Sequence, residues 1–292
     1  MNDVTDAAGL AALLEQVGYI ADEGLSTVGY LSIALQRPLM VEGDPGTGKT
    51  ALATALSEAL DVPLIRLQCY EGIDAQQALY DWDFARQILH LRTLEASRSQ
   101  IDAHDTEGLL YSERFLLARP ILKALKESPA VLLIDEIDRA DDEFEALLLE
   151  VLSQYQVSIP EFGTIRAATP PIVVLTSNRT RDVHDALKRR CLYHWIDHPD
   201  PAREVQIVQA RLPEVSERLT RRIVEVVQHL RAENRLIKLP GVAETIDWAR
   251  AVHELGRDDL DLDTATLTLG ALSKYREDTV HLRTVLAEQL AP

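Results

Sequence analysis

Cysteine is scarce in this chain of 292 residues, in which Cys69 and Cys191 are the only two. Two cysteines are too few for a disulfide framework, and their spacing is not that of a metal-binding motif. The sequence therefore argues against a disulfide-stabilised scaffold and against a zinc or iron–sulfur centre. Both thiols are predicted to be reduced and to serve as small hydrophobic residues.

Long apolar runs and an excess of positive charge are also missing. No run of about 18 apolar residues is present, so no membrane-spanning helix is expected. The chain begins with Asn2, Asp3 and Asp6 rather than with the basic start of a signal peptide, which predicts a cytoplasmic location. Acidic residues outnumber basic ones by 47 to 30, and the formal net charge is −17. This balance disfavours a broad nucleic-acid-binding face, because such faces neutralise phosphates with Lys and Arg, but it leaves a local basic pore open.

The pattern of apolar residues changes once along the chain. Between about residues 36 and 197, short apolar runs alternate with helical stretches, as expected of a parallel sheet with crossover helices. After residue 198 the sequence is helical throughout, and Asp200 and Pro201 suit an N-cap and a first helical position. The predicted strands are 38–41, 62–67, 131–134, 172–175 and 192–196, and the predicted terminal helices are near 201–211, 215–234, 242–255 and 263–290. We predict an α/β core over residues 1–198, followed by a smaller all-α domain over 199–292.

A phosphate-binding loop occupies residues 43–50, between the first predicted strand and a helical run. Its glycines let successive backbone N–H groups turn toward phosphate oxygens, and the helix adds the positive end of its dipole. Lys49 is predicted to bridge the β- and γ-phosphates, and Thr50 to offer its hydroxyl to Mg²⁺. The alternative is a Gly-Pro turn with an incidental Lys-Thr pair. The predicted nucleotide-binding residues are Gly43, Asp44, Pro45, Gly46, Thr47, Gly48, Lys49, Thr50 and Ala51.

Polar side chains follow two other predicted strands. The run 131–134 ends in Asp135 and Glu136, at the sheet edge where ligands bind in open α/β folds. Asp135 is predicted to hold Mg²⁺ through its water shell, and Glu136 to polarise the attacking water as general base, with a plain helix cap as the alternative. Asn178 follows the run 172–175 and is predicted to orient the lytic water or touch the γ-phosphate, unless it is simply a turn residue.

A basic pair, Arg189 and Arg190, follows the last of these motifs. One interpretation is a helix C-terminus whose positive charge suits the helix dipole. The other is an arginine finger that reaches the γ-phosphate held by a neighbouring subunit, which is worth about 10³ to 10⁵ in rate. The second interpretation makes activity depend on assembly.

The order of these motifs resembles that of the AAA+ ATPases and, among them, the MoxR group. The resemblance extends from about Gly18 to the last predicted helix, and segments 69–92 and 176–197 are similar to the CoxD-type branch. The quoted motifs are Cys69-Tyr70-Glu71-Gly72-Ile73-Asp74, Ala78-Leu79-Tyr80-Asp81-Trp82, Arg86-Gln87, Ser177-Asn178-Arg179-Thr180-Arg181 and Lys188-Arg189-Arg190-Cys191-Leu192-Tyr193-His194-Trp195. Members of that branch are associated with maturation of the molybdenum-containing carbon monoxide dehydrogenase and its relatives, usually beside a partner with a von Willebrand factor A domain.

The resemblance implies a P-loop AAA+ core whose helical domain acts as a lid, and a ring, hexameric in the family, with ATP and Mg²⁺ held between subunits. Hydrolysis would then remodel a client protein by lid and subunit rotation. Inserts near 70–92 and 155–168, the second expected as a hairpin around Phe162, would face the pore or the client, although Trp82 and Phe162 fit core positions equally well. Tyr19 and Ile20 occupy the place of the adenine-side residues, or else belong to an amphipathic helix.

One feature departs from the family pattern. The second-sensor position, commonly Arg, corresponds to Ala243, and Arg250 lies one to two turns further on. Of the arginine pair, Arg190 is preferred as the finger because Cys191 follows it, where the family usually has an apolar or aromatic residue. The predicted function is an ATP-hydrolysing chaperone for a metalloenzyme. The alternatives are a nucleic-acid-dependent AAA+ motor or loader and a nucleotide-gated scaffold without turnover.

Overall fold

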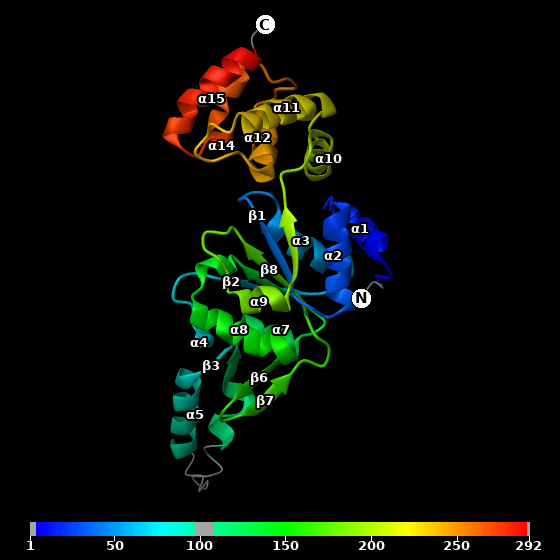
Figure 1. The fold of residues 1–292 in the computed structure, drawn as a ribbon. Helices are drawn as coiled ribbons and strands as arrows, with labels where there is room; N and C mark the ends of the chain where they lie inside the picture. The colour runs from blue at the N-terminus through cyan, green and yellow to red at the C-terminus, as the bar shows by residue number, and fades with distance from the viewer. Residues whose placement is uncertain (1–3, 97–107, 291–292) are drawn as a thin grey trace. The chain divides into compact units, whose positions relative to one another are not determined.

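A computed structural model describes residues 4–96 and 108–290 of the chain, so the start at Asn2 and Asp3 lies outside the described residues. Five strands form one sheet in the order β2-β5-β8-β1-β9, and the elements can be followed in Figure 1. They are β1 (Leu39–Gly43), β2 (Leu64–Gln68), β5 (Val131–Asp135), β8 (Ile172–Ser177) and β9 (Leu192–Ile196). All five predicted strands and the parallel α/β sheet are confirmed.

The sheet forms because its central strands are continuous apolar runs, which suit a parallel sheet that is buried on both faces. All five residues of β5 are buried. The strand pairs in parallel with β2, where Val131 lies opposite Leu64, and with β8, where it lies opposite Ile172. The carboxyl ends of β5 and β8, where the predicted acidic and amide side chains follow, therefore share one edge of the sheet.

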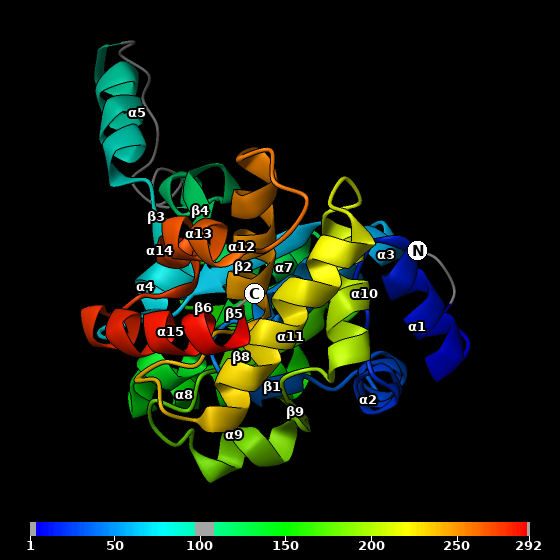
Figure 2. The same ribbon diagram turned by 90° about the horizontal axis from the view of Figure 1, so that it is seen from above.

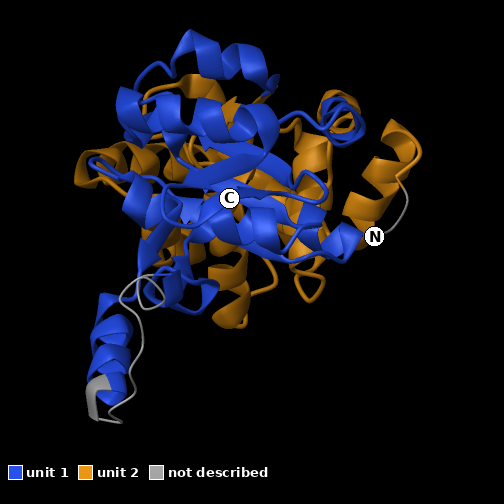
Figure 3. Ribbon diagram, turned by 90° about the horizontal axis from the view of Figure 1, so that it is seen from below, with its two compact units in different colours: residues 1–3, 28–41, 56–194 blue, residues 4–27, 42–55, 195–292 orange. Residues whose placement is uncertain are grey.

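The chain divides into two compact units, coloured separately in Figure 3. Among the described residues, unit 1 contains 28–41 and 56–194, and unit 2 contains 4–27, 42–55 and 195–290. The phosphate loop thus belongs to unit 2 with the predicted helical domain, whereas Asp135, Glu136, Asn178 and the arginine pair belong to unit 1.

Unit 1 contains most of the five-stranded sheet, together with helices and two small two-stranded sheets. Its further elements are α4 (Ala75–Ala78), β3 (Tyr80–Trp82), α5 (Phe84–Ala96), η1 (Glu113–Phe115), β4 (Leu116–Ala118), α7 (Pro120–Lys126), η2 (Ile137–Arg139), α8 (Asp142–Gln154), β6 (Gln156–Ile159), β7 (Gly163–Arg166) and α9 (Asp185–Arg190). Helix α8 begins where Asp141 accepts a hydrogen bond from the backbone N–H of Phe144, and it buries Phe144, Leu148 and Val151 in the core.

The two predicted inserts take different forms. Strands β6 and β7 pair in antiparallel fashion, which confirms the hairpin, and Phe162 at its turn is 38% exposed. Trp82 is 8% exposed and packs edge-on against Tyr80 and Tyr111, so this side chain is a core residue. Helix α5 extends away from the rest of unit 1 (Figures 1 and 2) and exposes apolar side chains, among them Phe84 and Leu89.

Unit 2 has a helical core of its own, built around the fully buried Trp248. Its helices are α1 (Ala7–Gln16), α10 (Pro201–Arg211), α11 (Glu217–Glu233), α12 (Val242–Glu254), α13 (Leu262–Leu267), α14 (Leu269–Leu272) and α15 (Arg276–Gln289). Helices α2 (Glu23–Ala34) and α3 (Lys49–Leu60) each have residues in both units. Asp200 caps α10 as predicted, because its side chain accepts a hydrogen bond from Arg203 N–H.

The prediction of one helix over 263–290 is wrong, because three separate helices occupy this segment. The first break falls at Thr268, whose hydroxyl donates to the backbone oxygen of Thr264 and accepts a hydrogen bond from the indole N–H of Trp248. Such back-bonding by Thr competes with helix continuation. Among the described residues, no helix is long and apolar enough to cross a membrane.

Candidate active site

The phosphate loop depends on three glycines with positive φ. The φ angles are +157° at Gly43, +83° at Gly46 and +96° at Gly48, a region that side-chain-bearing residues rarely adopt. A Cβ atom at Gly43 would lie 2.4 Å from the backbone oxygen of Ile196, so no other residue fits there. A Cβ at Gly48 would meet no heavy atom within 4 Å, which means that this part of the loop borders open space. The loop can therefore be approached closely by a phosphate group.

Lys49 lies at the start of α3 and is buried, with 6% of its surface exposed. Its ammonium group donates to the backbone oxygens of Gly43 at 2.8 Å and Asp44 at 2.7 Å, so the cation is held against the loop. The hydroxyl of Thr47 donates to the same Asp44 oxygen at 2.9 Å. Thr50 and Ala51 follow in the first turn of α3, where backbone N–H groups have no intrahelical partner. Together these groups form a binding site for anions.

Helix α12 contacts the phosphate loop at its N-terminus. The backbone N–H of Ala243 donates to the backbone oxygen of Gly46 at 3.2 Å. A Cβ atom on Gly241 would lie 2.8 Å from the Cα of Gly46, so this approach of two backbones requires glycine. Ala243, the predicted second-sensor position, thus meets the loop through its backbone, and Arg250 is exposed further along α12.

A buried ion pair holds the start of α12 in place. Glu204 is fully buried, and both of its carboxylate oxygens accept from the guanidinium of Arg231, at 2.6 and 2.8 Å. Arg231 also donates to the backbone oxygen of Pro240 at 2.6 Å, and the hydroxyl of Thr245 donates to Glu204 at 2.7 Å. This network connects α10, α11 and α12 directly beside the residues that touch the loop. Sequence reasoning missed it, because its members are far apart in the chain.

The segment around Tyr19 and Ile20 is fastened to α10. Arg203 donates to the backbone oxygen of Ile20 at 3.0 Å and to the carboxylate of Asp22 at 3.1 Å. Burial raises the pKa of the half-buried Tyr19, whose phenol therefore stays neutral. Both predicted adenine-side residues thus lie in unit 2 with the phosphate loop.

The acidic strand end in unit 1 is tightly organised. Asp135 is 2% exposed, and its two oxygens accept from the hydroxyl of Thr176 and from Arg66, each at 2.5 Å. Glu136 has a φ of +55°, an uncommon backbone conformation that often marks functional positions. Its backbone N–H donates to the Thr176 hydroxyl at 2.9 Å. One threonine of β8 therefore fixes both predicted acidic residues.

The Glu136 carboxylate has partners that the sequence did not suggest. One of its oxygens accepts from the side-chain amide of Gln68 at 3.1 Å and from Arg139, also at 3.1 Å. Gln68 is the last residue of β2, which pairs with β5, so strand register places an amide beside the predicted general base. Asn178 is half-buried and directly follows β8, the strand that carries Thr176.

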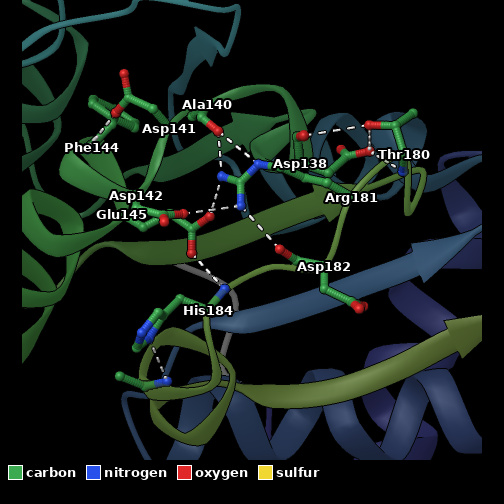
Figure 4. Close-up of polar contacts among 11 residues, drawn as sticks. Asp138, Ala140, Asp141, Asp142, Phe144, Glu145, Thr180, Arg181, Asp182 and His184 are labelled. Carbon is green, nitrogen blue, oxygen red and sulfur yellow. Dashed lines mark hydrogen bonds and ion pairs between the residues drawn. The ribbon is translucent and has the colours of Figure 1, made fainter.

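The chain after Asn178 is attached to the chain after Glu136 by the contacts drawn in Figure 4. The backbone N–H and the hydroxyl of Thr180 both donate to the carboxylate of Asp138, at 2.8 and 2.7 Å. The guanidinium of Arg181 donates to the backbone oxygen of Ala140 and to the carboxylate of Glu145. Glu145 is 1% exposed and also accepts from the backbone N–H of His184 at 2.7 Å, immediately before α9. The two loops and the start of α9 therefore form one connected structure.

The two predicted finger residues have different environments at the end of α9. The guanidinium of Arg190 donates to the backbone oxygens of Leu152 and Ser153, at the C-terminus of α8. Arg189 is exposed, and its guanidinium forms no hydrogen bond or ion pair with any residue that the structure describes.

The two cysteines are buried, as their role as small hydrophobic residues requires. Burial raises the pKa of each thiol to about 12, so both remain protonated at neutral pH. In the described part of the chain, no three His, Cys, Asp or Glu side chains are grouped so that they could hold a metal ion by themselves.

One protein-family model, two related sequences and one solved structure are similar to this chain. The family model described as AAA domain (dynein-related subfamily) matches residues 38–191. An uncharacterised protein of Staphylococcus aureus (strain bovine RF122 / ET3-1) is 28% identical over 172 residues, a match that covers 57% of this chain and only 57% of the relative. An uncharacterised protein of Staphylococcus epidermidis is 24% identical over 246 residues, covering 78% of this chain and 86% of the relative. The structure of a point mutant of RuvB from Thermotoga maritima is similar in fold, with a TM-score of 0.50 and 16% identity over 92% of this chain and 73% of that one.

Proposed function

We propose, from the premise that this chain belongs to the dynein-related AAA domain family, that it hydrolyses ATP at sites shared between subunits and uses the energy to remodel a client protein. The membership makes the chain a nucleotide-binding ATPase. The site shared between subunits, the ring and the client are our proposals and do not follow from the family membership alone. The observation that carries the proposal is the arrangement around Thr176, which fixes Asp135 and Glu136 at the carboxyl edge of a parallel sheet.

ATP and Mg²⁺ suit the residues present. The glycines of the phosphate loop leave space for close approach, and Lys49 and the first turn of α3 supply cationic and N–H groups for phosphate. We propose that Thr50 and Asp135 hold Mg²⁺, since hydroxyl and carboxylate oxygens are ligands that this ion prefers. The bound metal would neutralise charge on the phosphates. Tyr19 and Ile20 are proposed to lie on the adenine side.

Glu136 is proposed as the general base that removes a proton from the attacking water, with Asn178 orienting that water. The Gln68 amide and Arg139 hold one Glu136 oxygen at 3.1 Å each. A carboxylate oxygen has about two acceptor positions, so these two donors occupy this oxygen. Productive hydrolysis is therefore proposed to require that Glu136 turn away from at least one of these two donors.

The finer assignment is a chaperone of MoxR type in the CoxD-like branch. Its support is the resemblance in segments 69–92 and 176–197, together with a hairpin and a projecting helix α5 that offer exposed apolar side chains. We propose a cytoplasmic hexamer whose core spans residues 1–198 and whose lid spans 199–292. Its proposed client is a molybdenum-containing oxidoreductase such as carbon monoxide dehydrogenase, and its proposed partner carries a von Willebrand factor A domain.

The first experiment tests catalysis by phosphate release from Mg-ATP. Glu136→Gln is expected to lower kcat by about 10³-fold and to leave ATP binding intact, because the neutral amide cannot accept the proton. Glu150→Gln, an exposed change on α8, is the matched control and should keep the wild-type rate. Wild-type turnover in Glu136→Gln would refute the role of this residue.

The second experiment tests the client. The wild-type protein, a von Willebrand factor A partner and an immature molybdenum enzyme are mixed with Mg-ATP, and the activity of the molybdenum enzyme is measured. We expect maturation with wild type and none with Glu136→Gln. Salt-sensitive stimulation of hydrolysis by DNA or RNA, without any maturation, would instead support the nucleic-acid motor.

A further inference from the structure

Unit 1 contains a cavity of about 620 Å³ that is strongly basic. Four arginines line it, Arg37, Arg166, Arg189 and Arg190, and none of the described residues that line it carries a carboxylate. In a chain with a net charge of −17, such a concentration of positive charge is unusual. Within residues 4–96 and 108–290, two of the four guanidinium groups, those of Arg37 and Arg190, form hydrogen bonds, and the other two form none. The bonded arginines therefore serve to position the protein chain, whereas the other two can interact with a ligand.

Arg37 holds the C-terminus of α9. Its guanidinium donates to the backbone oxygens of Arg189 at 2.8 Å, Arg190 at 3.0 Å and Cys191 at 3.3 Å. These oxygens belong to the last turn of the helix or follow it, where carbonyl groups have no intrahelical partner and carry the negative end of the dipole. A planar fork of donors satisfies several of them at once, which a Lys ammonium cannot do in the same geometry.

Arg190 fastens the same turn of α9 to α8. Its guanidinium donates to the backbone oxygens of Leu152 and Ser153 at the end of α8. Adjacent residues on a helix project about 100° apart, so a helix that turns Arg190 toward α8 turns Arg189 elsewhere. Arg189 is exposed, and its guanidinium, like that of Arg166 on β7, forms no hydrogen bond or ion pair with any residue that the structure describes.

We propose that Arg189 supplies the guanidinium that reaches the triphosphate bound by the next subunit, and that Arg37 is the positioning residue that sets it there. This inference rests on the proposed function and specifies which residues complete the shared site. Arg190 keeps α9 attached to its own subunit. Arg166 contributes positive charge to the cavity, and no hydrogen bond or ion pair among the described residues joins its side chain to α9. A misplacement of about 1 Å in a catalytic group can cost about 10²-fold in rate, so loss of a brace can nearly equal loss of the finger.

The test compares four variants by steady-state ATP hydrolysis. Arg189→Gln is expected to lower kcat at least about 100-fold, and Arg37→Gln about 10- to 100-fold, each with KM changed less than about 3-fold, because the lost contact acts on the transition state. Arg37→Lys should not recover the rate if the fork geometry matters. Arg166→Gln removes a charge from the same cavity without removing a hydrogen bond to α9, and it should change kcat less than about 3-fold.

Mixing experiments assign each residue to a side of the interface. Glu136→Gln lacks the base, and Arg189→Gln lacks the finger, so each alone is inactive. In a mixed assembly, an Arg189→Gln subunit can meet the intact Arg189 of a Glu136→Gln subunit, and activity should partly return. Arg37→Gln should also complement Glu136→Gln. Lys49→Ala should not, because both defects then lie on the nucleotide-holding side.

Several results would overturn the inference. They are an Arg37→Lys rate equal to wild type, an Arg166→Gln loss as large as that of Arg37→Gln, or no recovery when Arg37→Gln and Glu136→Gln are mixed. If Arg37→Gln does not fold, as judged by circular dichroism, the Arg37→Lys rate and its mixing with Glu136→Gln decide the question. A wild-type protein without ATPase activity would refute the proposed function itself, whereas an active wild type with an unaffected Arg37→Gln would refute only this inference.

Discussion

The phosphate loop and the end of α9 are built in opposite ways. The loop carries its own signal in a short stretch of sequence, because three glycines with positive φ and Lys49 all lie within residues 43–50, although Gly43 and Gly46 also pack against the distant Ile196 and Gly241. The arginines of α9 are determined by distant partners. Arg37 lies 152 residues from Arg189 in the chain, and Arg190 is bound to the end of α8. A site of the first kind can be recognised from a short motif, whereas a site of the second kind requires the fold.

The largest loss of folding stability is expected when a distant partner is removed from the hydrogen-bond network that supports α12. Glu204→Gln leaves the Arg231 guanidinium buried without a carboxylate, which should lower the free energy of unfolding by about 3–5 kcal/mol. Urea unfolding measures it. The double variant Glu204→Gln with Arg231→Met removes the unpaired charge and should recover much of the loss. If the double variant were no more stable than the single one, the buried charge would not be the cause.

A smaller effect is expected within the loop itself. Gly43→Ala places a Cβ atom 2.4 Å from the backbone oxygen of Ile196 and should cost about 2–4 kcal/mol together with nucleotide binding. Gly48→Ala is the matched control, since it also has positive φ but meets no atom within 4 Å, and it should cost about 1 kcal/mol of stability. Equal losses of stability in the two variants would show that backbone strain alone, and not the close approach at Gly43, shapes the loop.

The smallest effect concerns pH. Burial, and then the charge of Arg231, lower the pKa of His198, although Asp44, whose carboxylate lies 3.6 Å from Nε2, as well as Glu204 and Asp197 oppose this. The folded state therefore disfavours the charged ring. The stability from the neutral ring is fully present above the unfolded pKa of about 6.5 and is lost as pH falls through the folded value.

The measurement is urea unfolding between pH 7.5 and 5, compared between wild type and His198→Gln. The wild type should lose more stability over this range than the variant, because only the wild type carries the buried ring. Parallel curves would mean that His198 does not titrate differently in the folded and unfolded states.

The sequence predicted those parts of the molecule that short segments encode. The runs that became β5 and β8, the loop at 43–50 and the hairpin around Phe162 each carry their own pattern of apolar residues and glycines. Within 263–290, which was predicted as a single helix, the first break falls at Thr268, whose hydroxyl bonds to Trp248, a partner 20 residues away. The contacts of Glu136 with Gln68 could not be predicted, because they depend on the register of two strands that are distant in the chain.

The choice between Arg189 and Arg190 also depends on contacts with residues that are distant in the chain. Sequence comparison at Cys191 favoured Arg190 as the finger, and that assignment stays a prediction. The backbone oxygens of α8, which accept from Arg190, lie more than thirty residues earlier in the chain. No local pattern around residues 185–191 indicates that they are there. The proposal that Arg189 is the finger arises only from these long-range contacts.

The central claim is that hydrolysis needs groups from two subunits. The most direct test measures ATP hydrolysis per subunit over a range of protein concentrations, with particle mass determined by light scattering in the same samples. We predict that the rate per subunit rises as the assembly forms, and that Arg189→Gln assembles equally well but stays slow. A constant rate per subunit across the transition from monomer to assembly would contradict the claim.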